Sequence, residues 1–178
     1  MAEKHLSIDE LEAGLGEIRQ APRDRGVLRL FVRRPKANAR EVLEEGHLDP
    51  ARGLVGDTWE TRGSPAHPDN QLNIMNARAI ALVAQSPDRW ALAGDQLYID
   101  LDLSGDNLPP GTRVALGSAV IEVTEEPHTG CRKFAARFGI DAVKFVNSPE
   151  GKQLRLRGLN AKVVVPGVIR VGDIARKH

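Results

Sequence analysis

Glycine and proline residues divide this chain into short apolar runs, and that division restricts the folds open to it. Turn residues such as Pro109-Pro110-Gly111-Thr112 and Gly117-Ser118 separate runs of strand length. Strands and helices do not alternate in the sustained way that builds a doubly wound parallel sheet. The pattern therefore predicts a mainly β fold, a partly closed β-barrel with a few short helices. Strands are expected at residues 27–32, 40–45, 71–75, 96–103, 113–116, 119–124, 162–165 and 168–171.

The run at residues 96–103 has the clearest alternation. Its odd-numbered positions, from Leu97 to Leu103, are apolar and the positions between them are mostly polar, so a half-buried strand with one wet face is expected. Asp100 and Asp102 fall on that wet face, where solvation is favoured over paired acid–base chemistry. Near the end of the chain, residues 162–165 and 168–171 are expected to pair as a closing hairpin.

Helix signals are fewer and more local. Ser7 and Glu10 form a capping box ahead of an apolar face, so residues 8–19 are expected to form an amphipathic helix. This helix is assigned to an N-terminal extension, residues 1–25, and the barrel domain to residues 26–178. Asn76 is expected to cap a second helix. A third is expected at residues 140–146, before a break at residues 148–151.

The single cysteine lies in a polar stretch at residues 126–134. Thr129 is the expected N-cap of a short helix that carries Cys131 and two phenylalanines on one face and ends at Gly139. A thiol in the first turn of a helix, next to Arg132 and Lys133, should have a lowered pKa because positive charge stabilises the thiolate. A thiolate is both a nucleophile and a soft metal ligand.

The same spacing supports a second interpretation. Cys131 would lie on the apolar stripe of its own helix, and an unpaired cysteine is often simply buried. His128 also has two interpretations: it either orients and polarises the thiolate or only forms local hydrogen bonds in a loop. The residues alone leave both pairs of alternatives open.

Charge is unevenly distributed along the chain. Residues 131–178 contain 11 Lys and Arg against 3 Asp and Glu, whereas residues 1–130 contain 14 against 21. The basic part therefore begins at the cysteine, which favours an anionic partner. Aromatic residues make up only 4% of the chain and offer little material for stacking bases, so a small phosphorylated ligand is favoured over nucleic acid.

Two further groups of residues are candidates for a site. Glycines at positions 53 and 56 are expected to form a tight turn that aims Asp57. Arg33 and Arg34 end the first strand and would matter if they pointed into the same opening as Cys131. Residues 62–70 are rich in Gly, Pro, Ser and Asn, which is typical of a flexible loop.

Several classes of site are not expected. The sequence has no phosphate-binding Gly-x-x-x-x-Gly-Lys-Ser/Thr loop and no dinucleotide fingerprint. Its five histidines are too scattered to form a zinc motif, so no zinc is expected. No apolar run is long enough to span a membrane, and one cysteine cannot form an internal disulfide framework. These features favour a cytoplasmic protein that has no membrane partner.

Three motifs carry a family resemblance: Gly-x-x-Gly-Asp at residues 53–57, a segment at residues 117–131 that ends on Pro-His-Thr-Gly-Cys, and Arg157-Gly158 followed by a glycine-containing segment at residues 163–173. In this order and spacing they resemble the MOSC domain over residues 26–175. That domain is found at the C-terminus of molybdenum cofactor sulfurases and as stand-alone bacterial proteins.

The resemblance implies a barrel-like fold and a cysteine used in sulfur or molybdenum-cofactor chemistry. By position that residue is Cys131, which would carry sulfur as a persulfide or ligate molybdenum, with His128 as its catalytic neighbour. The protein would be a sulfur transferase or a component of a molybdenum-cofactor-dependent oxidoreductase. The molybdenum cofactor would contact nearby basic and polar residues: Arg132, Lys133, Arg157, Thr129 and Gly130, with Asp57 and Asn73 across the opening.

The chain departs from the family pattern in ways that keep a second hypothesis open. It is too short to include the pyridoxal-phosphate-dependent desulfurase of the fused members, so no pyridoxal phosphate is expected here, and a separate cysteine desulfurase or redox partner would be needed. It also lacks the N-terminal β-rich domain of the amidoxime-reducing members, and His-Thr-Gly precedes the cysteine where other branches commonly have Pro or Arg. The second hypothesis is a binding module without turnover, which holds a small anionic ligand or a partner protein while Cys131 only packs.

Overall fold

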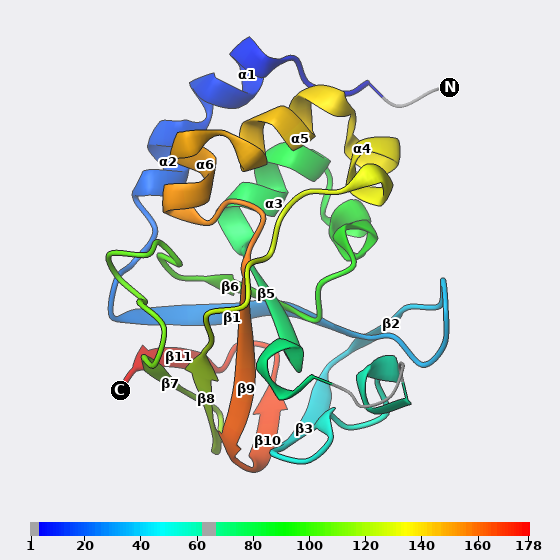
Figure 1. Cartoon of the computed structure of the whole chain (residues 1–178), viewed down its shortest axis with the longest axis vertical. Coiled ribbons are helices and arrows are strands. Elements are labelled where there is room, and N and C mark those ends of the chain that lie inside the picture. Colours follow the sequence, from blue (N-terminus) through cyan, green and yellow to red (C-terminus); the bar gives the residue numbers. More distant parts are fainter. Residues whose placement is uncertain (1–3, 62–66) are drawn as a thin grey trace.

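The computed structural model describes residues 4–61 and 67–178, which form a β-barrel with a layer of helices on one side of it (Figure 1). Within these residues, seven strands close a ring in the order β11-β7-β8-β9-β5-β6-β1, because β1 pairs with both β6 and β11. The predicted barrel is confirmed, and its ring is complete. Its strands are β1 (Arg25–Arg33), β5 (Leu72–Asn76), β6 (Leu97–Asp100), β7 (Arg113–Leu116), β8 (Ala119–Val123), β9 (Leu159–Val165) and β11 (Ile174–Lys177).

A second, three-stranded sheet closes one end of the barrel. It consists of β3 (Glu45–Asp49), β4 (Gly53–Leu54) and β10 (Gly167–Arg170), in the order β10-β3-β4, and β2 (Glu41–Leu43) connects it to β1. Leu48, Leu54 and Ile169 from this sheet are buried in the same core as the barrel strands. The expected closing hairpin is wrong, because β9 already pairs with β5 on one edge and β8 on the other, so β10 pairs with β3 instead.

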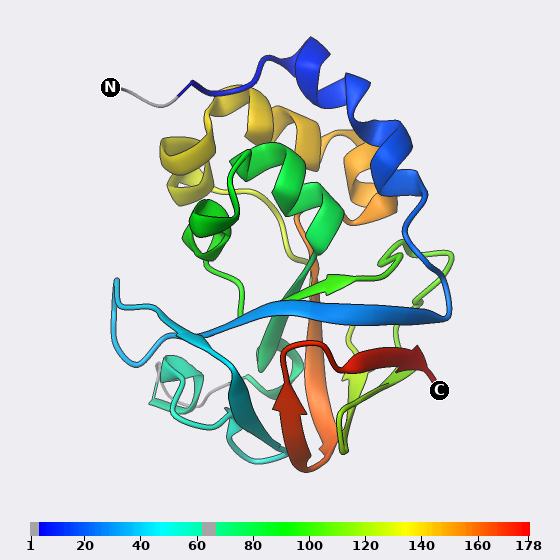
Figure 2. The same ribbon diagram turned by 180° about the vertical axis from the view of Figure 1, so that it is seen from behind.

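The helical layer covers the outer face of the barrel along β1, β5 and β6 (Figure 2). It consists of α1 (Ile8–Ala13), α2 (Leu15–Arg19), α3 (Ala77–Ala84), α4 (Arg132–Phe138), α5 (Ile140–Asn147), α6 (Pro149–Leu154) and the 3-10 helix η3 (Pro87–Ala93). None of the helices in residues 4–61 and 67–178 has both the length and the apolar character needed to cross a membrane.

The local helix signals were largely correct. The capping box of Ser7 and Glu10 is present, although the expected helix at residues 8–19 is interrupted at Gly14. Leu11 and Ile18 from α1 and α2 are buried in the helical core. The break expected at residues 148–151 is confirmed at Ser148, which ends α5 and caps α6, but residues 149–151 are already helical. Pro149 occupies the first position of α6, where a missing N–H is tolerated.

Two hydrophobic cores meet across strands β1, β5 and β6. One fills the barrel, and the other lies between the helices and includes Val32, Met75 and Tyr98 from these strands. Tyr98 is fully buried, so the wet face predicted for residues 96–103 is wrong, because the helical layer covers it. The strand itself also ends early, at Asp100, whose carboxylate accepts a hydrogen bond from Arg78 at 2.8 Å.

The remaining loop prediction is only partly within the described chain. Of residues 62–70, residues 62–66 lie outside the described residues, and Pro68–Asn70 form the short 3-10 helix η2. Another 3-10 helix, η1 (Thr58–Thr61), precedes that gap. The segment at residues 124–131 then leads from the barrel to the helices, ending at Cys131.

Candidate functional site

Cys131 lies where the chain enters the helical layer. It is itself the N-cap of α4, so the prediction of Thr129 as N-cap is wrong by two residues. The buried stripe of α4 consists of Phe134 and Phe138, whereas Cys131 is exposed. This exposure contradicts the interpretation in which Cys131 packs into a core.

A pocket of about 670 Å³ opens beside Cys131 and is lined by residues from both layers. Its lining includes four predicted site residues, His128, Lys133, Arg157 and Asn73, together with Cys131. Among the described residues, no Asp or Glu lines the pocket, whereas six cationic side chains do: Arg34, Lys36, Arg40, Lys133, Arg137 and Arg157. The lining therefore favours an anion strongly.

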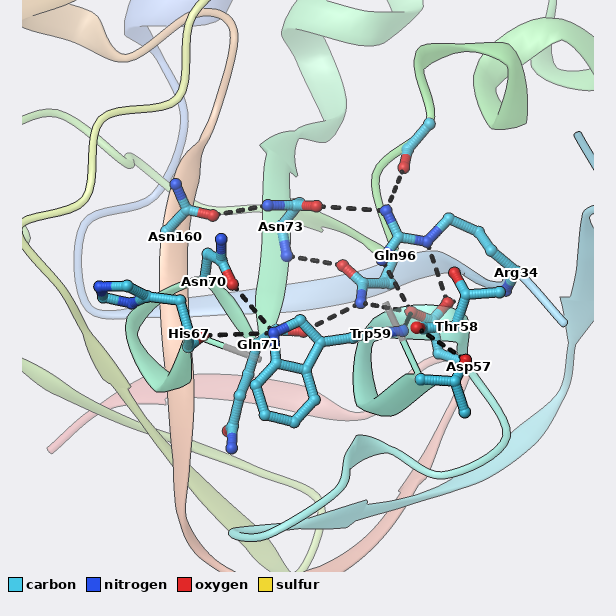
Figure 3. Close-up of polar contacts among 12 residues, drawn as sticks. Arg34, Asp57, Thr58, Trp59, His67, Asn70, Gln71, Asn73, Gln96 and Asn160 are labelled. Carbon is cyan, nitrogen blue, oxygen red and sulfur yellow. Dashed lines mark hydrogen bonds and ion pairs between the residues drawn. The ribbon is translucent and has the colours of Figure 1, made fainter. Parts of the chain in front are cut away.

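Asp57 lies behind this pocket. It is 2% exposed, and its carboxylate accepts hydrogen bonds from Arg34 Nε at 3.0 Å and Nη2 at 2.7 Å (Figure 3). Burial raises the pKa of Asp57, but Arg34 and the backbone N–H groups of Arg34 and Trp59 bring it below its usual value. Asp57 thus acts on the pocket through Arg34. The sequence suggested that Arg34 would matter if it pointed into the same opening as Cys131, and Arg34 does line that pocket.

A chain of amides continues from Arg34 across the barrel end (Figure 3). Arg34 Nη1 donates to Asn73 Oδ1 at 3.3 Å, and Asn73 Nδ2 donates to Asn160 Oδ1 at 2.5 Å. Asn160 Nδ2 in turn donates to the carbonyl oxygens of Glu126 at 3.0 Å and Pro127 at 3.2 Å. The barrel therefore holds the start of the segment that ends at Cys131.

The other end of that segment is held from the helical layer. Asn147, the last residue of α5, accepts a hydrogen bond from the N–H of Gly130 at 2.9 Å and donates to its carbonyl oxygen at 3.2 Å. A side chain at Gly130 would approach Val146 to 3.0 Å, so the fit there is close. Gly130 thus lets the backbone approach α5 closely. Thr129 and Arg132 are exposed and do not line the Cys131 pocket.

Asp95 is the deepest ionisable group at the site. Its Oδ1 lies 2.7 Å from His128 Nε2 and its Oδ2 lies 2.5 Å from Arg157 Nη1, and the carboxylate is fully buried. Burial raises the pKa of Asp95, but Arg157 and then His128 lower it by more, so the carboxylate stays ionised. Arg157 also donates to the carbonyl oxygen of Ala93 at 2.9 Å and lies 4.8 Å from the ring centre of Phe134.

A smaller cavity of about 340 Å³ lies on the other side of the same segment. His128 and Arg157 line both the pocket and this cavity, and Thr129 lines the cavity only. The pair held by Asp95 therefore forms the wall between the two spaces.

The environment of Cys131 favours its thiolate. Partial burial raises the pKa of the thiol, but the backbone N–H groups of Phe134 and Lys133 lower it, and Arg157 and Arg137 lower it further. The net result is a pKa below the usual value. The predicted direction agrees, although the cations that act on the thiol are Arg157 and Arg137 and not the predicted side chains of Arg132 and Lys133.

We expect the rate of Cys131 alkylation by iodoacetamide to rise with pH around a midpoint below about 8.5, the value of a free thiol. Only the thiolate reacts, so the midpoint reports the pKa directly. The rate is followed by intact mass, since Cys131 is the only cysteine. A midpoint at or above the free value would mean that the positive lining does not act on the sulfur.

Arg40 and Arg137 are two cations that line the pocket close to each other. Burial lowers the pKa of Arg137, and Arg40 lowers it further because the two charges have the same sign. Arg40 Nε is buried without a hydrogen-bond partner among the described residues, and Arg137 Nη1 donates only to the carbonyl oxygen of Leu92, at 2.6 Å. Two cations without a carboxylate between them are suited to an anionic ligand.

The sequence did not single out Asp95, Arg40, Arg137 or Asn147. Gly94 before Asp95 and the basic excess after Cys131 were visible signals, but neither specifies a contact. Arg40 reaches the pocket from the connection between β1 and β2, and Arg137 from α4, so only the tertiary fold brings them together. Among the described residues, no group of three or more His, Cys, Asp or Glu side chains gathers to hold a metal ion.

Comparison with solved structures places the fold among proteins of low sequence identity. The YuaD protein from Bacillus subtilis matches with a TM-score of 0.59 at 15% identity, over 86% of this chain and 96% of that one. YiiM from Escherichia coli matches with a TM-score of 0.56 at 21% identity, over 85% and 69% of the two chains. YiiM from Geobacillus stearothermophilus matches with a TM-score of 0.59 at 16% identity, over 86% and 75%. These similarities establish the fold.

The sequence itself carries the family assignment. No curated protein matches the chain closely enough to count as a relative. The MOSC domain profile matches residues 63–176, which include Cys131, His128 and Arg157 and begin later than the resemblance at residue 26 suggested. With most of its length matched by that profile, and with the barrel described above, this chain belongs to the MOSC domain family.

Proposed function

We propose that the pocket beside Cys131 binds a small ligand with more than one negative charge, and that the Cys131 thiolate is the atom that reacts with it or ligates it. The observation that carries this proposal is an exposed cysteine, with a thiol pKa lowered by its surroundings, in a pocket lined by six cations and, among the described residues, no carboxylate. Charge-assisted hydrogen bonds from arginine suit phosphate and related groups.

The molybdenum cofactor fits this lining. Its phosphate and dithiolene groups are anionic, and a cysteine thiolate is a soft ligand. Arg40, Arg137 and Lys133 are the candidates for its anionic groups, because no carboxylate within residues 4–61 and 67–178 pairs with them, and Cys131 is the candidate metal ligand. When bound, the cofactor would supply two-electron redox chemistry at the metal.

The chain's own residues have distinct parts in this proposal. Arg34 and Arg157 are fixed by buried carboxylates and define the pocket wall. Asn73 donates to Asn160, which binds the backbone at the start of the segment before Cys131. Asn147 binds the backbone of Gly130, so the segment that presents Cys131 is held at both ends. His128 lies beside the thiol's pocket and is the candidate to exchange a proton with a bound ligand.

A persulfide role uses the same thiolate differently. The thiolate would attack the outer sulfur of a donor persulfide, and the donor would leave as a thiolate. An exposed cysteine can meet such a donor without a change in the barrel. This role needs a separate cysteine desulfurase, and the redox role needs a separate electron donor, so the proposal includes one such partner protein and a reducing, cytoplasmic setting.

Metal analysis and intact mass, taken on protein made in a host that synthesises molybdenum cofactor, test the proposal. We expect either molybdenum at one atom per chain or a mass increase of one sulfur atom that a reductant removes. Cys131→Ala should lose whichever of the two the wild type carries, and the surface variant Arg113→Gln should keep it.

The outcomes separate the two hypotheses. Molybdenum retained in full by Cys131→Ala would mean that the cysteine is not the ligand. Neither molybdenum nor added sulfur on wild-type protein, in a host shown to load another molybdoenzyme, would favour a binding module without turnover.

A further inference from the structure

The buried carboxylate of Asp95 joins two residues that line the Cys131 pocket. It is 0% exposed and is the only carboxylate within the described chain that is recorded in contact with His128 and Arg157 together. The function proposed above uses it only to fix Arg157. A buried carboxylate is costly unless it is paired, so a group of this kind at the wall of a site calls for an explanation.

Hydrogen-bond chemistry at Asp95 allows a single arrangement. An ionised carboxylate only accepts, and a guanidinium only donates, so Oδ2 accepts from Arg157 Nη1. For the 2.7 Å contact at Oδ1 to be a hydrogen bond, His128 Nε2 must also donate. The neutral imidazole then carries its proton on Nε2, and Nδ1 keeps a free lone pair.

Nδ1 of His128 is available to a ligand. Within residues 4–61 and 67–178 no hydrogen bond to Nδ1 is recorded, and the side chain is 17% exposed. It lines the Cys131 pocket and the adjoining cavity of about 340 Å³. Because the six cations of the pocket only donate hydrogen bonds, an imidazole lone pair adds an acceptor to a lining dominated by donors.

We propose that Asp95 is the positioning residue of this site: it holds Arg157 beside Cys131 and fixes His128 in the Nε2–H form, so that Nδ1 accepts a hydrogen bond from the bound ligand. The inference rests on the function proposed above. It narrows the ligand to one that carries an O–H or N–H group next to its anionic groups, since a fully deprotonated anion has no hydrogen to offer Nδ1.

Long-range ¹H–¹⁵N correlation spectra of the imidazoles test this on the ligand-free protein, with His128 assigned from a His128→Gln spectrum. In the wild type, at a pH where His128 is neutral, we expect the Nε2–H form alone. In Asp95→Asn the amide has one oxygen for two donors. Arg157 can only donate and so takes that oxygen, which leaves the amide NH₂ facing His128 Nε2, so His128 should switch to the Nδ1–H form.

A matched control is available behind the same pocket. Asp57→Asn also removes a buried, arginine-paired carboxylate, but Asp57 is not recorded in contact with His128, so the His128 tautomer should stay Nε2–H. A wild type in the Nδ1–H form, or a folded Asp95→Asn that keeps the Nε2–H form, would overturn the inference. The wild-type spectrum decides the matter if Asp95→Asn does not fold. Neither readout depends on molybdenum or sulfur loading, so failure here is distinct from failure of the proposed function.

Discussion

Replacing Arg157 by methionine is expected to lower the free energy of unfolding by about 3–5 kcal/mol near neutral pH. The substitution removes the partner that lies 2.5 Å from Asp95 and leaves a fully buried carboxylate with His128 alone. It also leaves the carbonyl oxygen of Ala93 without the Arg157 hydrogen bond. A loss of this size is a large part of the stability of an ordinary domain.

The loss should depend on pH in a defined direction. In the wild type the pKa of Asp95 is lowered, so its stabilisation is present above the unfolded value of about 3.9 and is lost as the pH falls through the folded value. In Arg157→Met, burial instead raises the pKa of Asp95, and protonation relieves the penalty as the pH falls. The deficit should therefore be largest near pH 7 and smaller near pH 4.

Urea unfolding of both proteins at several pH values measures this deficit. Arg113→Met is the matched control, because Arg113 pairs with Glu122 at the surface and its side chain is 52% exposed. That control should change stability by less than about 1 kcal/mol at any pH. Equal losses from the two variants would contradict a special role for the buried pair.

Replacing Arg40 by glutamine is expected to weaken anion binding at the Cys131 pocket by roughly 10-fold to 100-fold. The change removes one charge-assisted hydrogen bond, worth about 1.5–3 kcal/mol. Stability should not fall with it. Arg40 repels Arg137 and holds a buried Nε without a described partner, so the free energy of unfolding should stay level or rise by about 0.5–1 kcal/mol.

Protection of Cys131 from iodoacetamide by pyrophosphate measures the binding, and urea unfolding measures the stability. Arg23→Gln is the control, since Arg23 is 62% exposed and does not line this pocket. Unchanged protection in Arg40→Gln would show that Arg40 does not contact the anion. A loss of both binding and stability would show that Arg40 supports the fold and not the ligand.

Local chemistry made much of the fold predictable. The capping box at Ser7, the cap at Asn76 and the turn between β7 and β8 depend on neighbours within a few residues, and each formed as expected. The predictions that failed concern contacts between distant segments. Tyr98 was predicted to face solvent because the sequence of residues 96–103 does not show that helices cover it. β10 was predicted to pair with β9 because the local sequence does not show that β5 and β8 already occupy both edges of β9.

The same division applies to the candidate site. Cys131, His128, Lys133, Arg157 and Asn73 were identified from motifs and spacing, and the structure brings them to one pocket. Asp57 was assigned to the opening but lies behind Arg34, because a carboxylate next to an arginine gains more from pairing than from facing an anion pocket. Asp95 was not identified, because a lone aspartate between a glycine and a glutamine has no local signal of burial.

The segment at residues 126–130 is held from both layers, by Asn160 on the barrel side and Asn147 on the helix side. A ligand seated beside Cys131 would contact side chains of both layers, such as Asn73 on β5 and Phe134 on α4, and so would link the barrel to the helices. A ligand that binds only when the helical layer and the barrel are in contact adds its binding free energy to that contact. Ligand binding beside Cys131 should accordingly raise the free energy needed to separate the helical layer from the barrel.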